Sequence, residues 1–146
     1  MIGINGQNIM LNKPSDILKI VLFDSSCNLK ELEQGIEDKS YLVITFDYES
    51  HQLLNKNNIK HEISDSYLNR VELETIQKKS YELVDWFKEE KPNELEYKGV
   101  NVGSLMRVEF NYFLVPFLKN FVAIIKIYQK YSSAEFSASI PLHEIV

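Results

Sequence analysis

The sequence is poor in cysteine, glycine and proline. Its 146 residues include a single cysteine, Cys27, together with five glycines and four prolines. One thiol can form neither an intrachain disulfide nor a two-cysteine metal motif, so nothing requires an oxidising compartment and we predict a cytoplasmic protein. So little glycine and proline excludes collagen-like and low-complexity chains.

Positive charge is also scarce. Sixteen lysines and arginines stand against 21 aspartates and glutamates, which gives a formal net charge of −5. A general nucleic-acid binder needs a basic face to neutralise phosphates. The charge balance therefore argues against nucleic acid as a partner.

Long apolar runs are few. The N-terminus lacks the basic and apolar regions of a secretory signal. Only residues 110–128 are rich enough in large apolar side chains to suggest a membrane span, and Lys119 and Lys126 interrupt them. Because a lysine in the middle of a bilayer costs roughly 2.5–3.5 kcal/mol, we predict a core helix and no membrane span.

The chain does contain short apolar runs that alternate with helical patterns. Residues 17–23 and 41–46 are nearly continuous apolar runs, which indicates strands buried on both faces, as in a parallel sheet. Residues 59–63 and 135–140 are weaker strand candidates. The length suits one compact domain. We predict an α/β fold, a single Rossmann-like domain with a mainly parallel sheet and helices on both faces.

Helical patterns fill the segments between the predicted strands. They cover residues 29–36, 49–57, 69–90 and 102–131. In residues 69–90, one apolar stripe is surrounded by Glu, Lys and Gln, which is typical of a surface helix. Pro116 lies inside the last pattern and predicts a kink or a split in that helix.

The domain is expected to occupy residues 16–146, after an N-terminal arm of residues 1–15. Another helix is expected to begin at Pro141 and is cut short at Val146. This interrupted pattern suggests the N-terminal half of a larger two-domain architecture.

Polar side chains follow the predicted strands. In open α/β sheets, ligands bind beyond the carboxyl ends of the strands. The candidate ligand-binding residues at these ends are Asp24, Ser25, Asp47, Glu49, His51 and Asp65. Asp and Ser are also ordinary turn and capping residues, so Asp24 and Asp47 could instead cap helices.

Three of these residues could also support catalysis. Asp47, Glu49 and His51 could supply a general base or metal ligands, since carboxylate and imidazole suit zinc or manganese. The alternative for His51 is an exposed position in the first turn of a helix. No HExxH, GxSxG or Walker A sequence occurs. We therefore predict no metal and no cofactor, and the catalytic residues stay unknown.

Further ligand-binding candidates lie near the start of the last helix. Gly99 and Gly103 would let backbone amides face an anion, although a glycine turn with Asn101 as the N-cap is the simpler alternative. Glu109 lies in an aromatic stretch beside Phe110, where a buried carboxylate needs a partner or a raised pKa. Exposed and cleft-facing positions for Glu109 are both open.

The last helix is apolar on more than one side. The interface candidates on it are Phe110, Phe113, Phe117, Phe121 and Tyr128. A helix on the outside of a sheet needs only one apolar stripe, so we expect a surface that this chain cannot cover by itself. The expected partner is a second copy of the chain, giving a homo-oligomer, or a partner domain.

A family resemblance is carried by the order of several segments. These are VITFDYESHQLLNKNNIKHEISDSYL, YELVDWF, LEYKGVNVGSL followed by the long aromatic helix, and SASIPLHEIV. In this order they resemble the N-terminal region of archaeal and bacterial surface-carbohydrate biosynthesis proteins, which are glycosyltransferase-like proteins of the two-Rossmann-domain (GT-B) kind. The resemblance covers about residues 40–146.

The resemblance implies that this region shapes the acceptor side of a cleft, while a second domain holds a nucleotide sugar. The expected function is an acceptor-side domain in surface polysaccharide or glycan biosynthesis, with a glycan acceptor as partner and no catalysis by this chain alone. Two other functions stay open. One is a stand-alone protein-interaction module that docks through its aromatic helix. The other is a small independent enzyme that uses Asp47, Glu49 and His51.

Overall fold

The computed structural model describes residues 19–35, 40–88 and 96–139. Within them the protein has a mixed α/β fold with a parallel four-stranded sheet, as the apolar runs predicted. The expected N-terminal arm and the expected helix at Pro141 lie outside the described residues.

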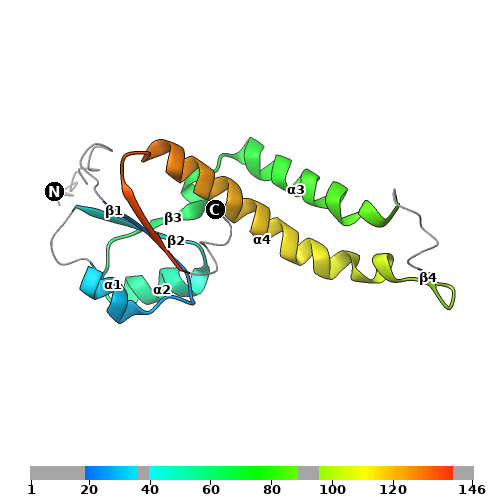
Figure 1. Ribbon diagram of the computed structural model, residues 1–146, viewed down its shortest axis with the longest axis horizontal. Coiled ribbons are helices and arrows are strands. Elements are labelled where there is room, and N and C mark those ends of the chain that lie inside the picture. The colour runs from blue at the N-terminus through cyan, green and yellow to red at the C-terminus, as the bar shows by residue number, and fades with distance from the viewer. Residues whose placement is uncertain (1–18, 36–39, 89–95, 140–146) are drawn as a thin grey trace, which may run out of the picture.

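The sheet has the strand order β3-β2-β1-β6, and every neighbouring pair is parallel. Its strands are β1 (Lys19–Phe23), β2 (Tyr41–Thr45), β3 (Glu62–Ile63) and β6 (Glu135–Ala138). In the centre of the sheet, Val21 of β1 is in register with Val43 of β2 and Ser137 of β6. Figure 1 shows β6 lying beside β1, although the two are far apart in the chain.

The third strand is shorter than the sequence predicted. The amide of Ile59 donates to the Leu54 carbonyl, and the Ile59 carbonyl contacts the ring of His61. The Ile59 amide is thus bonded to the end of the preceding helix, and the Ile59 carbonyl is bonded to His61. Neither group is free to pair with β2, so residues 59–61 do not extend the strand. Only Glu62 and Ile63 form the strand.

Two groups of buried side chains hold the sheet to its helices. Phe23 and Val43 pack with Leu32 of α1 (Leu29–Gly35) and Leu54 of α2 (Tyr48–Lys56). Ile20, Leu22 and Ile44 pack instead with Ala123, Ile124 and Ile127 of α4 (Val102–Lys130). Successive residues Val43 and Ile44 belong to different groups and are both fully buried, which explains why the apolar run does not alternate.

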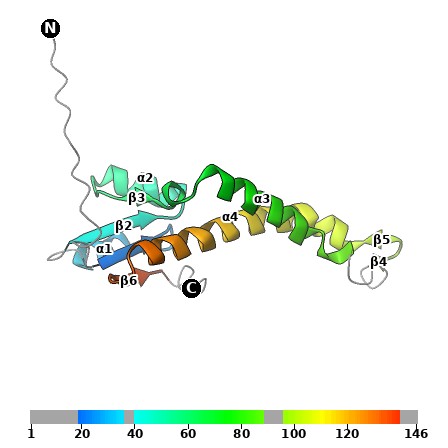
Figure 2. The same ribbon diagram turned by 90° about the horizontal axis from the view of Figure 1, so that it is seen from above.

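Two helices extend away from the sheet as an arm. α3 (Arg70–Val84) packs along α4, and a small hairpin of β4 (Glu96–Tyr97) and β5 (Val100–Asn101) lies at the far end (Figure 2). We call α3, this hairpin and the N-terminal half of α4 the arm. Two short 3-10 helices, η2 (Ser64–Tyr67) and η3 (Trp86–Lys88), precede and follow α3.

The arm corrects two predictions. The helix predicted over residues 69–90 ends at Val84, because the Asp85 amide closes the last turn on the Glu82 and Leu83 carbonyls. α4 continues through Pro116 as one 29-residue helix, so the predicted split does not occur. At roughly 1.5 Å per residue, α4 is about 44 Å long and reaches from the hairpin to the sheet.

The start of α3 is fixed by a reciprocal pair of hydrogen bonds. The Glu72 amide donates to Asn69 Oδ1 at 2.9 Å, and the Asn69 amide donates to Glu72 Oε2 at 2.8 Å. We expect Asn69→Ala to lower the free energy of unfolding by about 1 kcal/mol, because one helix amide loses its acceptor. Urea unfolding followed by circular dichroism measures this loss. The control is Arg70→Ala, which removes only an exposed ion pair with Glu74. Equal stability of the two variants would contradict the capping role.

Candidate functional site

The carboxyl ends of three parallel strands bring polar side chains together. Asp24 follows β1, Asp47 follows β2, and Ser139 follows β6. The Ser139 hydroxyl donates to Asp24 Oδ2 at 2.8 Å, and the Ser25 amide donates to Asp47 Oδ2 at 2.7 Å. We call Asp24, Ser25, Ser26, Cys27, Asp47 and Ser139 the strand-end cluster. The structure therefore brings together three of the predicted ligand-binding residues, namely Asp24, Ser25 and Asp47.

Asp24 organises the turn after β1. Its Oδ1 accepts from the Ser26 amide at 3.0 Å and from the Ser26 hydroxyl at 2.6 Å. The thiol of Cys27 lies 3.6 Å from the same oxygen. Partial burial is the main cause that raises the pKa of Cys27, and the charge of the Asp24 carboxylate adds to it, while a backbone hydrogen bond at Asp24 acts in the opposite direction. The thiol therefore stays protonated near neutral pH.

Asp47 joins the two turns at this edge of the sheet. Its Oδ1 accepts from the Ser50 amide at 2.7 Å and caps α2, while its Oδ2 accepts from the Ser25 amide. Burial by itself would raise the pKa of Asp47, but the Ser50 and Ser25 amides outweigh it and lower the pKa below its usual value. The capping alternative is thus confirmed for Asp47, and its carboxylate is ionised at neutral pH.

The strand order reverses at β1. From β1 the chain moves to β2 and β3 on one side, and it later returns to place β6 on the other side (Figure 1). In open α/β sheets, ligands bind at this switch point, outside the carboxyl ends of the two flanking strands. Asp24 and Ser139 flank the switch point directly. Ser139 falls within the strand predicted over residues 135–140, and no local sequence pattern indicates its contact with Asp24.

The other predicted strand-end residues, Glu49, His51 and Asp65, do not belong to the strand-end cluster. Glu49 is exposed in the first turn of α2, and Asp65 forms an ion pair with Lys119 of α4 at 2.9 Å. His51 Nδ1 lies 2.8 Å from His61 Nε2. Asp47 and His51 are joined through their backbones, since the His51 amide donates to the Asp47 carbonyl, but their side chains have different partners. Among the described residues, no three His, Cys, Asp or Glu side chains gather closely enough to hold a metal ion.

The two histidines form a short hydrogen-bonded chain. His61 Nδ1 lies 2.8 Å from the Ile59 carbonyl, and Asn55 Nδ2 lies 3.0 Å from His51 Nε2. A carbonyl only accepts, so His61 Nδ1 carries a proton, and in the neutral pair His61 Nε2 accepts from His51 Nδ1. The four ring nitrogens are then all engaged, and none is left to bind a ligand. His51 lies in α2 and His61 lies just before β3, so no local sequence pattern indicates this pair.

The candidates Gly99, Gly103 and Glu109 belong to the arm, far from the strand ends (Figure 2). Gly99 has a positive φ of 79° in the hairpin turn. Asn101 Oδ1 accepts from the Ser104 amide at 2.9 Å and caps α4, as the simpler alternative predicted. Glu109 is exposed and, with Gly103, lines an apolar groove between η3 and α4.

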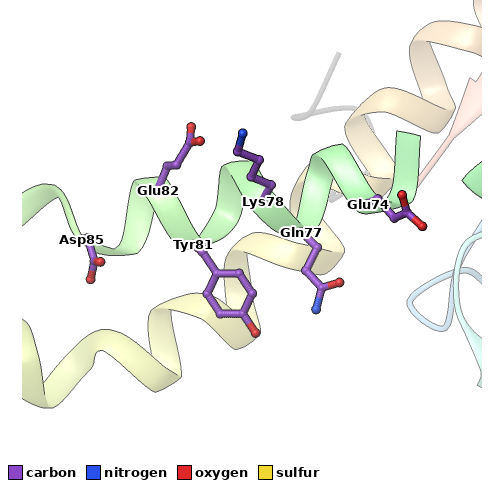
Figure 3. A pocket seen from close by; sticks show the side chains of 6 residues that line it. All are labelled: Glu74, Gln77, Lys78, Tyr81, Glu82 and Asp85. Atoms are coloured by element: carbon purple, nitrogen blue, oxygen red, sulfur yellow. The ribbon is translucent and has the colours of Figure 1, made fainter. Parts of the chain in front are cut away.

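A second depression lies along the outer side of α3. Figure 3 shows the six side chains that line it, five from this helix and one from the residue that caps its end: Glu74, Gln77, Lys78, Tyr81, Glu82 and Asp85. Side chains from one helix face do not converge on a ligand, so the depression is an open surface between them.

The predicted apolar surface on α4 is confirmed. We call it the exposed stripe, and it consists of Phe110, Phe113, Phe117, Phe121, Ile125 and Tyr128, which are 37–58% exposed. The Phe113 and Phe117 rings stack with their centroids 5.6 Å apart. The expectation of a core helix holds mainly for the C-terminal half of α4, where Ala123, Ile124 and Ile127 are buried, while Leu114 is the buried residue of its N-terminal half. By length and composition α4 could also cross a membrane, and 17% of its most apolar window is buried.

No protein-family model matches this chain, and neither does any curated protein or solved structure.

Proposed function

We propose that the chain is a Rossmann-like domain, with helices on both faces of its sheet, that forms the acceptor side of a glycosyltransferase-like protein in surface polysaccharide or glycan biosynthesis. The observation that carries the proposal is the strand order β3-β2-β1-β6, with Asp24 and Ser139 flanking its switch point. This order corresponds to the first half of a doubly wound sheet, where sugar and nucleotide ligands bind at the strand ends.

The chemistry of the strand-end cluster suits a hydroxyl-rich ligand. Each carboxylate oxygen can accept about two hydrogen bonds. Asp24 Oδ1 already accepts two from Ser26, whereas Asp24 Oδ2 and both oxygens of Asp47 accept one each and keep acceptor capacity. The side chains of Ser25 and Ser26 are exposed beside them. Carboxylates and hydroxyls of this kind hydrogen-bond readily to the hydroxyls of a glycan.

The same geometry favours binding over catalysis. Both aspartates hold backbone amides, so each acts as a fixed acceptor and neither is positioned as a free general base. Within the described residues, the two histidines engage each other instead of the cluster. In this proposal the chain is cytoplasmic and forms the acceptor site. A second domain binds the nucleotide sugar.

Ligand titration followed by amide chemical shifts tests this proposal. With neutral or acidic oligosaccharides, or with nucleotide sugars, we expect shifts at Ser25, Ser26 and Asp47. Ser139→Ala should weaken that binding roughly fivefold, the equivalent of about 1 kcal/mol for one hydrogen bond. The matched control is Ser104→Ala in the arm. Shifts confined to the arm or to the opposite edge of the sheet would contradict the proposal.

A second candidate is a protein-interaction module that docks through α4. The observation that favours it is the exposed stripe, since contiguous apolar patches of this kind mark interaction sites. This candidate and the acceptor domain use different surfaces of the chain.

A further inference from the structure

The middle of the exposed stripe faces neither of the two bodies that pack against α4. At its ends, Phe110 lines a groove with Trp86 of η3, and the Tyr128 ring lies 5.4 Å from that of Phe136 in β6. Asn111 of α4 contacts Ser80 of α3 through its side-chain oxygen at 3.1 Å, which places α3 on one side of the helix. Ala123 and Ile127 contact the sheet on another side. The stripe lies on the face of α4 between these two packed sides. It is exposed to solvent along the arm and along part of the C-terminal half of α4, which packs on the sheet.

The stripe is regular as well as exposed. Ring centroids of Phe110 and Phe113 are 6.4 Å apart, and those of Phe117 and Phe121 are 6.5 Å apart, with each pair within 9° of parallel. Phenyl groups of equal size therefore repeat at about one helical turn. Such a row presents knobs with gaps between them, which is the shape that another helix of the same kind fills.

The area of the surface matches what a stable dimer needs. At roughly 200 Å² for a large side chain, the exposed fractions of the stripe leave on the order of 500 Å² open. The apolar groove beside Phe110 adds Trp86, Val102 and Met106, which are 39–60% exposed. With these side chains the open apolar area is about 800 Å², the usual contribution of one partner to a specific interface.

We propose that a second copy of this chain covers the exposed stripe, so that two arms pack antiparallel as a four-helix bundle. A twofold interface uses one patch twice, and a straight row of equal rings is complementary to itself in that arrangement. Each arm contributes α3 and α4, and the stripe of α4 lies at the centre.

A bilayer fits the surface less well than a second copy. Glu109 is exposed and lines the apolar groove, and the chain has a net charge of −5, whereas helices that lie on membranes carry lysine and arginine beside their apolar face. Lys119 of α4 is held by Asp65 and Lys126 by Glu72. Insertion of α4 across a bilayer would have to break these ion pairs and the packing of Ile127 on the sheet.

Sedimentation equilibrium of the full chain from 1 to 200 µM tests the proposal. We expect a species of twice the 17.1 kDa chain mass. Phe117→Asp, at the centre of the stripe, should weaken dimerisation at least about 30-fold, as loss of a central interface residue does. The matched control is Tyr112→Asp, an aromatic residue 76% exposed on the opposite side of α4. It should leave the dissociation constant within about threefold, a range typical of a residue outside an interface.

A second measurement uses the unaltered chain, so it does not depend on how Phe117→Asp folds. Hydrogen exchange of amides 105–121 should slow as the concentration rises from 1 to 200 µM. A monomer throughout this range would overturn the proposal, and so would equal weakening by the two variants. Co-sedimentation with phosphatidylcholine and phosphatidylglycerol vesicles, without self-association, would overturn it in favour of a lipid surface. None of these results depends on ligand binding at the strand ends.

Discussion

Ile44→Ala is expected to lower the free energy of unfolding by about 2–5 kcal/mol, the usual range for a buried isoleucine cut back to alanine. Ile44 is fully buried in β2 and packs against the C-terminal half of α4. The substitution leaves a cavity between a central strand and the helix that covers it, and neither can move inward without disturbing the pairing of β1 and β2. Urea unfolding monitored by circular dichroism at 222 nm gives the value.

Ile63→Ala is the matched control for this prediction. Ile63 is the same residue type in the neighbouring strand β3, but 42% of its surface is exposed. Its truncation should therefore cost less than half as much as that of Ile44. Equal losses at the two positions would mean that the contact between β2 and α4 is not the main core of the domain.

Asp47→Ala is expected to destabilise the protein by about 2 kcal/mol. The substitution removes the acceptor for two backbone amides, those of Ser50 and Ser25, and so uncaps α2 and releases the turn after β1. Glu49→Ala is the matched control, because Glu49 is an exposed carboxylate in the same helical turn. A loss confined to Glu49→Ala would contradict the role of Asp47.

The same carboxylate gives the stability a defined dependence on pH. The pKa of Asp47 is lower in the folded chain than in the unfolded chain, so the unfolded state binds the proton more readily. The contribution is therefore complete above the unfolded pKa and is lost as the pH falls through the folded pKa. Asp47→Asn, which keeps one acceptor oxygen but no charge, should show a smaller loss of stability between pH 5 and pH 2 than the unaltered chain, measured by urea unfolding at each pH.

The sequence was most informative where burial is complete. The runs of β1 and β2 are apolar at successive positions because both sides of each strand are covered, and their burial allowed strand type and sheet class to be predicted. The short β3 could not be predicted in the same way. Residues 59–61 have strand-like composition, but a contact with the end of α2 determines their conformation.

The site was predictable in part for a related reason. Asp24 and Asp47 follow strongly predicted strands, and parallel strands end at one edge, so their proximity follows from the fold class. The contact between Ser139 and Asp24 joins residues 115 positions apart, and local sequence carries no signal for it. The His51–His61 pair likewise depends on how α2 returns to the sheet, which no spacing rule contains.

The position of β6 has a consequence for how the chain folds. β1 lies inside the sheet only because β6 pairs with it, and β6 begins at Glu135. During synthesis, β1 and β2 can pair early, but one edge of β1 stays open until nearly the whole described chain has been made. Contacts of such long sequence separation slow folding, and an open strand edge invites pairing with other chains. η3 and the β4–β5 hairpin separate α3 from α4 in the chain, and a contact such as that of Ser80 with Asn111 spans 31 residues, far fewer than the 115 between Asp24 and Ser139. The two helices of the arm can therefore assemble while the sheet is still incomplete.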